Sequence, residues 1–445
     1  MKKNIFLTDT LSTTKKNIFH NKNKITLYVC GITPYDFAHI GHGRCYIVFD
    51  SLVRIIRYFE YEITYCRNIT DIDDKLINKA NLIYNDPLKF IDIANEFYKY
   101  FLNDLSKLNC IRPDYEPRVT DCIEEIIIFI EKLIKNGFAY KINNDIYFEI
   151  EKYKDYGNLA KRNLEEQISG ARIAINNNKK NPLDFTLWKE STEKPNWPSI
   201  WGNGRPGWHI ECSVMSNKAF GETVDIHGGG MDLIFPHHEN EKAQSECHNK
   251  TKFVNIWMHC AFININKKKM SKSLGNSIFL KDIIEKYGAM EFRYYILSHS
   301  YISPIDFCLE NIESFSKSYK TLKNLFVDVS YNINFKYDHY LIDEINNYLC
   351  DDLNTAAVFG LIFKNIELIK KDNNLKKMIK KILSLCCGLN FKENNENKIN
   401  KNYSQEILDL INKREEARRC KNFKEADRIR DILIQNGIEI NDTKL

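Results

Sequence analysis

Apolar and polar positions in the first part of the chain follow two different periods. Residues 25–29 are a short run of β-branched and aromatic side chains, which is the pattern of a buried strand, and residues 61–67 are predicted to form a second strand. Residues 42–59 lie between them and repeat apolar positions at helical spacing, and Asp71 is placed to cap the helix after the second strand. This order of strand, helix, strand and helix predicts an α/β fold with a doubly wound, Rossmann-like parallel sheet.

The pattern weakens between residues 105 and 201, where turn residues multiply, and we expect an insertion into the sheet domain there. Strand patterns return at residues 223–227 and 253–262. No strand is expected between residue 301 and the end of a helical bundle near Leu389. The rest of the chain is expected to hold a polar linker (394–402), two helical segments and a short strand (438–440).

Composition narrows the class of protein. A chain of 445 residues exceeds what one core usually holds, so two to four domains are expected. Its 43% hydrophobic and 28% charged residues are typical of a soluble protein, and its net charge of +5 permits but does not require a polyanionic partner. The 13 cysteines are scattered and odd in number, which favours reduced thiols. No apolar run is long enough for a signal peptide or a membrane span, so we expect a cytoplasmic protein without membrane contact.

Two histidines stand where the first strand gives way to the first helix, in His39-Ile40-Gly41-His42. In a doubly wound sheet this crevice binds ligands, and the unpaired N–H groups at a helix start attract phosphate. Side chains three apart share a helix face, and Gly41 lets a nucleotide approach the backbone. Imidazoles there can donate hydrogen bonds to phosphate oxygens. Two surface histidines at an ordinary helix start are an equal alternative for these residues alone.

A lysine-rich loop at residues 267–276 carries Lys269 and Lys272 among serine and glycine residues. Such lysines suit the β and γ phosphates of ATP, although a solvated basic loop is the more common explanation of the loop alone. The two motifs in this order, with strands between them, are far more specific. They resemble the HIGH and KMSKS signatures of class I aminoacyl-tRNA synthetases. The resemblance implies that His39 and His42 stabilise the transition state at the α-phosphate and that Lys269 and Lys272 hold the pyrophosphate.

A third segment, Gly228-Gly229-Gly230, is expected to follow a strand and to let backbone N–H groups approach the nucleoside. A triple glycine suits a hairpin turn equally well, so the segment is a weak signal by itself. Together with the two signatures it completes the expected ATP site: His39, Gly41, His42, Gly228, Gly229, Gly230, Lys269 and Lys272.

Four dispersed residues have side chains that bind zinc well: Cys30, Cys212, His237 and Glu241. Cys30 ends the first strand just before the phosphate motif, and His237 and Glu241 are four apart and so share a helix face. The chain has no Cys-x-x-Cys pair, and buried thiols beside an acidic helix start explain the same residues more often. Spacing alone therefore leaves a metal site open.

Four longer blocks resemble cysteinyl-tRNA synthetases specifically: residues 30–36, 67–75, 205–212 and 235–241. The resemblance runs from about residue 25 to about residue 441 and implies that Cys30, Cys212, His237 and Glu241 bind one zinc ion. Zinc favours a thiolate over a hydroxyl and would therefore select cysteine against serine. The implied ligands are L-cysteine, ATP with Mg²⁺, and cysteine tRNA.

Three further residues are expected at the substrate. Thr70 and Trp208 are assigned to the wall of the amino-acid pocket and Asp232 to the substrate ammonium. A capping hydroxyl, a core aromatic ring and a loop-capping acid are the structural alternatives for the three. His209 and His238 are assigned to structural roles or to support of the metal ligands.

Between Lys413 and Arg430 there are eight basic and four acidic residues on two helical segments. Charge alone favours a solvated helix, whereas the resemblance places this segment in the anticodon-binding region of the family. The expected divisions are a first half of the Rossmann domain (1–104), a connective insertion (105–201), the second half (202–265), the lysine loop and stem-contact region (266–305), a helical bundle (306–392), and a linker with the basic tRNA-binding region (393–445).

The expected function is that of a monomeric cysteine–tRNA ligase. Two alternatives are a ligase that passes cysteine to a small amino-sugar acceptor and a non-catalytic zinc- or tRNA-binding protein. The basic C-terminal region argues against the first, and the presence of His39, His42, Lys269 and Lys272 together argues against the second.

Overall fold

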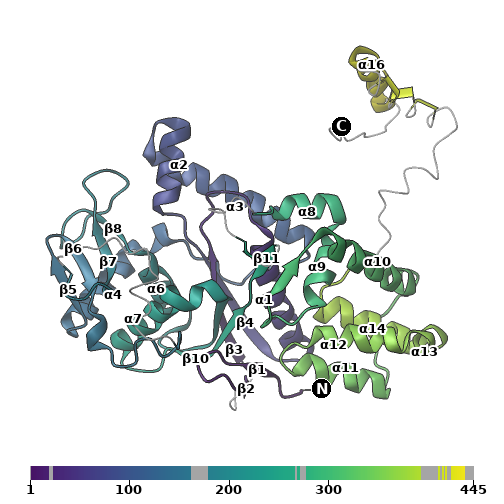
Figure 1. The fold of residues 1–445 in the computed structure, drawn as a ribbon, viewed down its shortest axis with the longest axis horizontal. Coiled ribbons are helices and arrows are strands. Elements are labelled where there is room, and N and C mark those ends of the chain that lie inside the picture. The colour runs from purple at the N-terminus through teal and green to yellow at the C-terminus, as the bar shows by residue number, and fades with distance from the viewer. Residues whose placement is uncertain are drawn as a thin grey trace. The chain divides into compact units, whose positions relative to one another are not determined.

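The computed structural model describes residues 2–19, 24–161, 179–265, 268–270 and 277–391, and in the C-terminal part residues 409–410, 413–414, 416–417 and 422–435. The chain separates into two units, Met1–Asn390 and Phe391–Leu445. Figure 1 shows the course of the chain through the larger unit, which contains all the described strands. Within the described ranges, every helix is too short or too polar to span a bilayer.

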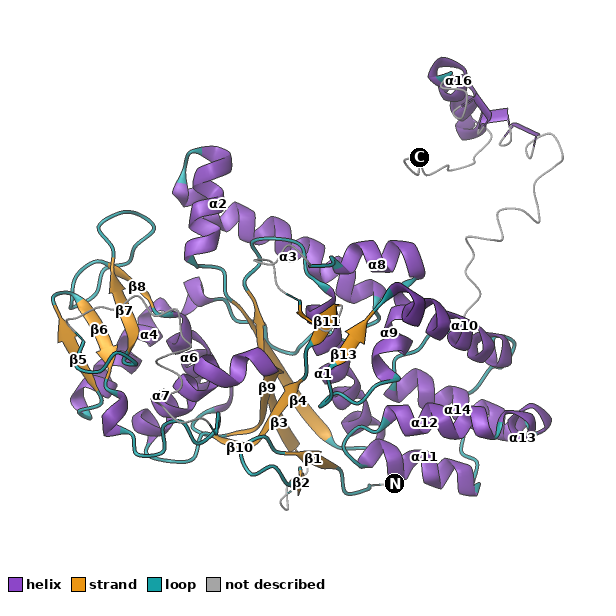
Figure 2. Cartoon of the chain, in the orientation of Figure 1, coloured by secondary structure: helices purple, strands orange, loops and turns teal. Residues whose placement is uncertain are grey.

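The centre of the larger unit is a four-stranded parallel sheet in the order β10-β9-β3-β4 (Figure 2). β3 (Lys24–Ile32) and β4 (Glu62–Ile69) are the first two predicted strands, and α1 (Ile40–Tyr58) is the helix between them. β9 (Val224–Gly230) and β10 (Val254–Cys260) are the strands predicted after the insertion. The predicted doubly wound α/β architecture is therefore confirmed.

Helices pack on this sheet and on one another. They are α2 (Asp74–Tyr84), α3 (Phe90–Lys107), α4 (Ile123–Lys135), α6 (Trp208–Phe220), η5 (Ile234–His238) and α7 (Glu239–Asn249). The helix cap predicted at Asp71 is wrong. Asp73 caps α2 by accepting a hydrogen bond from the Lys75 N–H, whereas buried Asp71 accepts hydrogen bonds from the N–H and hydroxyl of Thr120. The first carboxylate turns inward and fixes a neighbouring turn, which leaves the second to cap the helix.

The predicted insertion contains a four-stranded antiparallel sheet in the order β5-β6-β7-β8. Its strands are β5 (Ala139–Ile142), β6 (Asp145–Phe148), β7 (Phe185–Glu190) and β8 (Gly204–Pro206). Gly204 lies under the Trp188 ring, where a Cβ atom would stand 2.3 Å from the indole nitrogen. Because β8 runs directly into α6, this small sheet determines where α6 begins.

A second departure from the sequence pattern lies after residue 301, where no strand was expected. β13 (Ile305–Phe307) pairs in parallel with β11 (Ile263–Ile265), which also pairs with β12 (Lys268–Lys269). Only three residues long, β13 is too short for its alternation of buried and exposed side chains to stand out in the sequence. Arg44 of α1 fixes this sheet to the core by donating hydrogen bonds to the carbonyls of Phe262, Ser300 and Ser303.

Beyond this small sheet the larger unit is helical, as predicted. It contains α8 (Leu280–Tyr287), α9 (Ala289–Leu297), α10 (Leu309–Phe326), α11 (Tyr340–Cys350), α12 (Thr355–Lys364), α13 (Ile366–Lys371) and α14 (Asn373–Cys386). In the smaller unit, the described helix is α16 (Phe423–Gln435). The predicted linker (394–402) and final strand (438–440) lie outside the described residues.

An N-terminal hairpin, β1 (Phe6–Thr8) and β2 (Lys15–Asn17), is held by the turn between α11 and α12. The half-buried Asp352 carboxylate of this turn accepts hydrogen bonds from the Thr8 N–H, the Thr8 hydroxyl and the Tyr301 hydroxyl. Asp352 also has a φ of 60°, a left-handed conformation that aspartate tolerates better than alanine. One side chain thus fastens the hairpin, the small sheet and the helical bundle together.

We expect Asp352→Ala to lower the free energy of unfolding by about 2 kcal/mol, because it leaves several donors without their charged acceptor. Urea unfolding at unchanged slope is the measurement. The matched control is Asp351→Ala, which removes an exposed ion pair with Lys15 and should change stability by less than about 0.5 kcal/mol. Equal effects of the two substitutions would contradict the proposed junction.

Candidate active site and metal centre

His39 and His42 form a pair of stacked rings at the start of α1. The ring centroids are 3.7 Å apart and the planes meet at 14°. Each ring accepts a backbone hydrogen bond at Nδ1: the His42 N–H donates to His39 over 3.3 Å and the His39 N–H donates to His42 over 3.2 Å. A neutral imidazole that accepts at Nδ1 carries its proton at Nε2. The helix cap therefore sets the tautomer of both rings and makes each Nε2 a donor.

Gly41 makes this stack possible. A Cβ atom at Gly41 would stand 3.0 Å from both Nδ1 and Cε1 of His39, closer than side chains normally pack. The absence of that atom lets the His39 ring lie against the first turn of α1. The close approach of the His39 ring is therefore a second reason for glycine at position 41, beside the predicted approach of a ligand to the backbone.

The lysine loop begins and ends beside the histidine pair. Within the first part of the loop, the Met270 side chain lies 3.4 Å from the Cβ position of Gly41. After the loop, the Ile40 N–H donates to the Ile278 carbonyl over 3.0 Å, and the Leu280 N–H donates to the Ala38 carbonyl over 2.8 Å. Lys269 lies in β12, while Lys272 lies outside the described residues. The fold thus brings together the two signatures that the sequence places more than two hundred residues apart.

The four predicted zinc ligands also come together, at the carboxyl end of β3. Cys30 Sγ lies 3.7 Å from Cys212 Sγ and 3.5 Å from Glu241 Oε1. His237 Nε2 lies 2.9 Å from the same carboxylate oxygen. All four side chains are at most 5% exposed. We call these residues, Cys30, Cys212, His237 and Glu241, the outer set. They converge although Cys30 and Glu241 are 211 positions apart in the chain.

Charge in the outer set is divided between anionic and cationic groups. Burial alone raises the pKa of the Cys212 thiol, but hydrogen bonds with Cys30 and His237 outweigh it and lower the pKa to about 6. Burial alone lowers the pKa of His237, but the Glu241 carboxylate outweighs it and raises the pKa to about 10. A proton on His237 thus offsets part of the negative charge of the two buried anions. A divalent cation would serve the same purpose, and two sulfurs, an imidazole and a carboxylate form a donor set that suits zinc.

Two histidines that the sequence did not assign as ligands stand against the same cluster. His238 Nε2 lies 3.2 Å from Cys30 Sγ, and His227 Nε2 lies 3.7 Å from Cys30 Sγ and 3.2 Å from Glu241 Oε2. We call Cys30, His227, His238 and Glu241 the inner set; the four ligand atoms lie within 4.8 Å of one another. A signal for His227 was its strand register beside β3, where it pairs with Tyr28, but register is visible only once the strands are aligned.

Other histidines orient the rings of the cluster. His209 Nδ1 lies 3.0 Å from His237 Nδ1, which is the supporting position assigned to it from the sequence. His238 Nδ1 lies 2.7 Å from His259 Nε2, and His259 Nδ1 lies 2.7 Å from the Thr10 hydroxyl of the N-terminal hairpin. Ligand imidazoles are commonly held in this way through their second nitrogen.

The three predicted substrate residues come from different elements. The Trp208 ring stacks on His237 with centroids 4.4 Å apart, and buried Thr70 donates a hydrogen bond to Glu211 over 3.0 Å, beside Cys212 in the chain. Asp232 instead follows β9. Burial raises the pKa of the Cys260 thiol to about 11, and the nearby Asp232 carboxylate adds to this. Thr70 and Trp208 therefore adjoin the Cys/His/Glu cluster, while Asp232 lies at the end of the neighbouring strands.

The sequence predicted that the glycine run follows a strand. In the structure the run instead forms the end of that strand. Gly228, Gly229 and Gly230 are the last three residues of β9 and pair with Met258, His259 and Cys260 of β10. A Cβ atom at Gly228 would stand 2.3 Å from the Met258 carbonyl oxygen and 2.5 Å from the Phe49 ring. Close packing between β9, β10 and α1 is therefore the reason for glycine at this position.

Comparison with known proteins decides the family. Residues 16–317 match the family model described as the tRNA synthetases class I (C) catalytic domain. Proteins named Cysteine--tRNA ligase match nearly the whole chain: one from Hydrogenovibrio crunogenus is 42% identical over 95% of this chain and 93% of its own length. One from Buchnera aphidicola is 43% identical over 98% and 96%, respectively. The chain belongs to the cysteine–tRNA ligase family.

Members of this family are expected to share the class I synthetase fold, and the solved structures agree. The methionyl-tRNA synthetase of Mycobacterium tuberculosis, in complex with methionyl-adenylate, superposes with a TM-score of 0.59 at 13% identity and covers 82% of this chain and 89% of its own. A second structure of that enzyme gives a TM-score of 0.57. At this identity the likeness concerns the fold alone.

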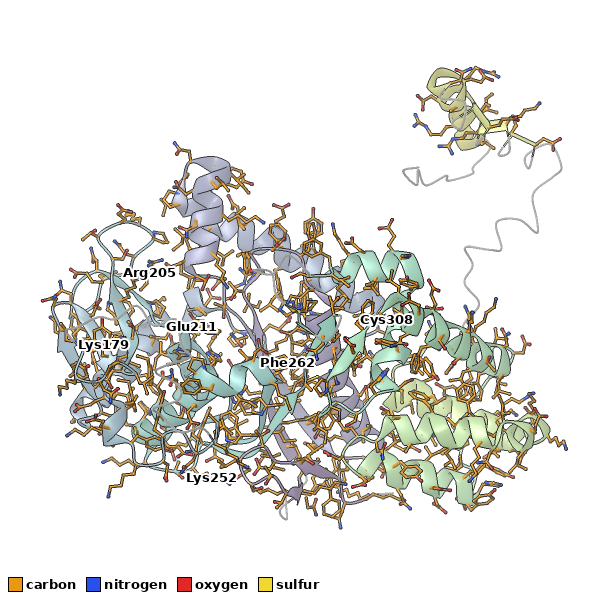
Figure 3. The ribbon with its side chains drawn as sticks, viewed as in Figure 1. Lys179, Arg205, Glu211, Lys252, Phe262 and Cys308 are labelled. Carbon is orange, nitrogen blue, oxygen red and sulfur yellow. The ribbon has the colours of Figure 1, made fainter. Side chains whose placement is uncertain are left out.

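In this member of the cysteine–tRNA ligase family, a cavity of about 640 Å³ lies between the insertion sheet and α6. Figure 3 labels three of its lining residues, Lys179, Arg205 and Glu211. Trp208 also lines it, and its ring stacks on that of His237. The residues of the outer set do not line this cavity, but His209, which lies 3.0 Å from His237, does.

Proposed function

We propose that this chain is a cysteine–tRNA ligase, which activates L-cysteine with ATP and passes the cysteinyl group to the 3′ end of cysteine tRNA. The observation that carries the proposal is the convergence of a buried Cys, Cys, His and Glu cluster with the histidine pair, since both stand at the carboxyl end of β3. Nearly full-length relatives named Cysteine--tRNA ligase support it. A thiol-binding centre beside a phosphate-binding helix start suits the activation of cysteine.

The outer set would hold one zinc ion, and Cys30, Cys212, His237 and Glu241 are proposed as its ligands. Bound zinc supplies an acceptor for the substrate thiolate, which serine cannot match with a neutral hydroxyl. His237 or Glu241 is proposed as the weaker ligand. Trp208 and Thr70 are proposed to shape the wall around the substrate, and Asp232 to meet its ammonium group.

The histidine pair and the lysine loop are proposed to act on ATP. The Nε2–H groups of His39 and His42 would donate to the α-phosphate as the substrate carboxylate oxygen attacks phosphorus and pyrophosphate leaves. Lys269 and Lys272 would hold the departing pyrophosphate together with Mg²⁺. Gly41 and the run Gly228, Gly229 and Gly230 are proposed to border the nucleotide. No side chain needs to form a covalent bond to the substrate.

The division of labour along the chain is also proposed. The two Rossmann segments (1–104 and 202–265), joined by the connective insertion (105–201), would form the adenylate. The segment 266–305 would meet the acceptor stem, and the basic region (393–445), which follows the helical bundle (306–392), would bind the tRNA anticodon. In α16, Arg428 and Arg430 each pair with an acid three positions earlier, so part of the positive charge is compensated. We further propose that the protein acts as a monomer in the cytoplasm.

Cysteine-dependent exchange of pyrophosphate into ATP, followed by charging of cysteine tRNA, tests the proposal. We expect both reactions with cysteine and neither with serine, because a hydroxyl is a poor zinc ligand. Exchange without charging would point to a small-molecule acceptor such as an amino sugar. If folded, zinc-loaded protein showed no exchange, the ligase activity would be excluded. The remaining alternative would then be a non-catalytic zinc- or tRNA-binding protein.

A further inference from the structure

We propose that the metal cluster has two overlapping positions for a single divalent ion, and that the inner set forms the second position. The inner set consists of Cys30, His227, His238 and Glu241, and it shares Cys30 and Glu241 with the outer set. The inference rests on the proposed function only in taking the outer set as a metal site. It concerns where the protein can hold the ion, and its test does not depend on catalysis.

The spacing of the inner ligand atoms suits a tetrahedral ion. Zinc bonds of 2.0–2.3 Å place tetrahedral ligand atoms about 3.3–3.8 Å apart. In the inner set, Cys30 Sγ lies 3.2 Å from His238 Nε2 and 3.7 Å from His227 Nε2. Glu241 lies 3.2 Å from His227 Nε2 through Oε2 and 3.9 Å from His238 Nε2 through Oε1. These separations fit as well as the 2.9–3.7 Å separations of the outer set.

The two oxygens of the Glu241 carboxylate face different histidines. Oε1 lies 2.9 Å from His237 Nε2 in the outer set, whereas Oε2 lies 3.2 Å from His227 Nε2 and makes no hydrogen bond. Glu241 is fully buried. A buried carboxylate oxygen without a hydrogen bond is costly, and a cation at the inner position would satisfy it. This buried oxygen, with an ion-pair contact to His227 and no well-aligned hydrogen bond, is an observation independent of the number of ligand side chains.

Support from neighbouring residues ranks the two positions. The outer ligand His237 is oriented by His209, and the inner ligand His238 is oriented by His259. The inner ligand His227 has no such support, because its Nδ1 is buried without a hydrogen-bond partner. Loss of a supporting hydrogen bond typically weakens metal binding about 10–100-fold. The inner position should therefore be weaker than the outer one by about that factor, and the shared Cys30 and Glu241 limit the cluster to one ion at a time.

The test uses Co²⁺, whose absorption spectrum reports the number of thiolate ligands, on the full chain. The variant Cys212→Ala/His237→Phe removes both ligands that are unique to the outer set, and the phenyl ring preserves stacking on Trp208. We expect it to bind one Co²⁺ per chain with about 10–100-fold weaker affinity than the wild type. Its thiolate-to-cobalt band should fall to about half, because one sulfur remains instead of two.

The matched control is His227→Phe/His238→Phe, which removes the ligands unique to the inner set. We expect this control to bind one Co²⁺ with the band intensity of the wild type. A folded outer-set variant that binds no Co²⁺ would overturn the proposal, and so would two equivalents in the wild type. A wild-type protein that binds no Co²⁺ at all would overturn the outer site as well, which distinguishes failure of the proposed function.

The single substitution Cys212→Ala serves if the double variant does not fold, since it leaves the inner set complete. The proposal then expects that adding His227→Phe weakens Co²⁺ binding by a further factor of about 10 or more. Unchanged affinity on adding His227→Phe would show that the ion stays with His237, Cys30 and Glu241, and the inner position would be rejected.

Discussion

A Cys30→Ser substitution is expected to lower zinc affinity about 10²–10³-fold, since four ligands together contribute roughly 10–16 kcal/mol and one contributes about a quarter of this. Cys30 belongs to both the outer and the inner set, so no alternative position rescues the ion. The kcat/KM for cysteine in pyrophosphate exchange should fall by a similar factor, because the substrate thiolate loses its acceptor.

The matched control for Cys30→Ser is Cys66→Ser. Cys66 lies on the neighbouring strand β4, is fully buried, and takes no part in either candidate set. It therefore reproduces the cost of placing a hydroxyl in the sheet core without touching the cluster. Zinc content, measured with a chromophoric chelator, should drop only in Cys30→Ser. Equal losses in the two variants would show that the metal responds to core stability rather than to the Cys30 thiolate.

The sheet was predictable from sequence because its strands are buried on both faces. β3 and β4 each contain a short run rich in β-branched and aromatic residues, 25–29 and 63–65, and such runs can be recognised without knowing the partner strands. Elements defined by contacts between distant segments were not predictable. β13 is three residues long and is a strand only because β11 lies beside it. In the sequence, Asp71 and Asp73 are equivalent candidates for the helix cap. Only the fold shows that Asp71 accepts hydrogen bonds from Thr120 instead.

The candidate site was even less predictable from sequence spacing, because it too depends on contacts between distant segments. Cys30, Cys212, His237 and Glu241 are too dispersed for spacing to indicate a metal, and only resemblance to a family joined them before the fold did. His227 was not predicted as a ligand because a histidine within a strand gives no periodic signal in the sequence. What its side chain faces depends on how β9 is aligned with the neighbouring strand β3. The role of Lys272 stays a prediction, because this residue lies outside those the structure describes.

Substitution of either motif histidine by asparagine should lower kcat for adenylate formation about 10²–10³-fold, the usual effect of removing one donor to a developing charge. Asparagine is chosen because it is among the best helix N-caps, so His39→Asn keeps an acceptor for the His42 N–H at the start of α1. Stability and zinc content should therefore remain those of the wild type. The KM for cysteine should change little, because the outer set binds the thiolate and the histidine pair does not.

A control imidazole lies far from this chemistry. His248, near the end of α7, stacks on Phe129 with ring centroids 3.6 Å apart, and His248→Asn should leave kcat unchanged. The decisive comparison is between kcat and stability. If His39→Asn retained the wild-type kcat, the stacked pair would be a helix cap and nothing more. A loss of kcat at unchanged stability requires the donor at Nε2, because asparagine keeps the cap but places no N–H group at the position of the imidazole Nε2.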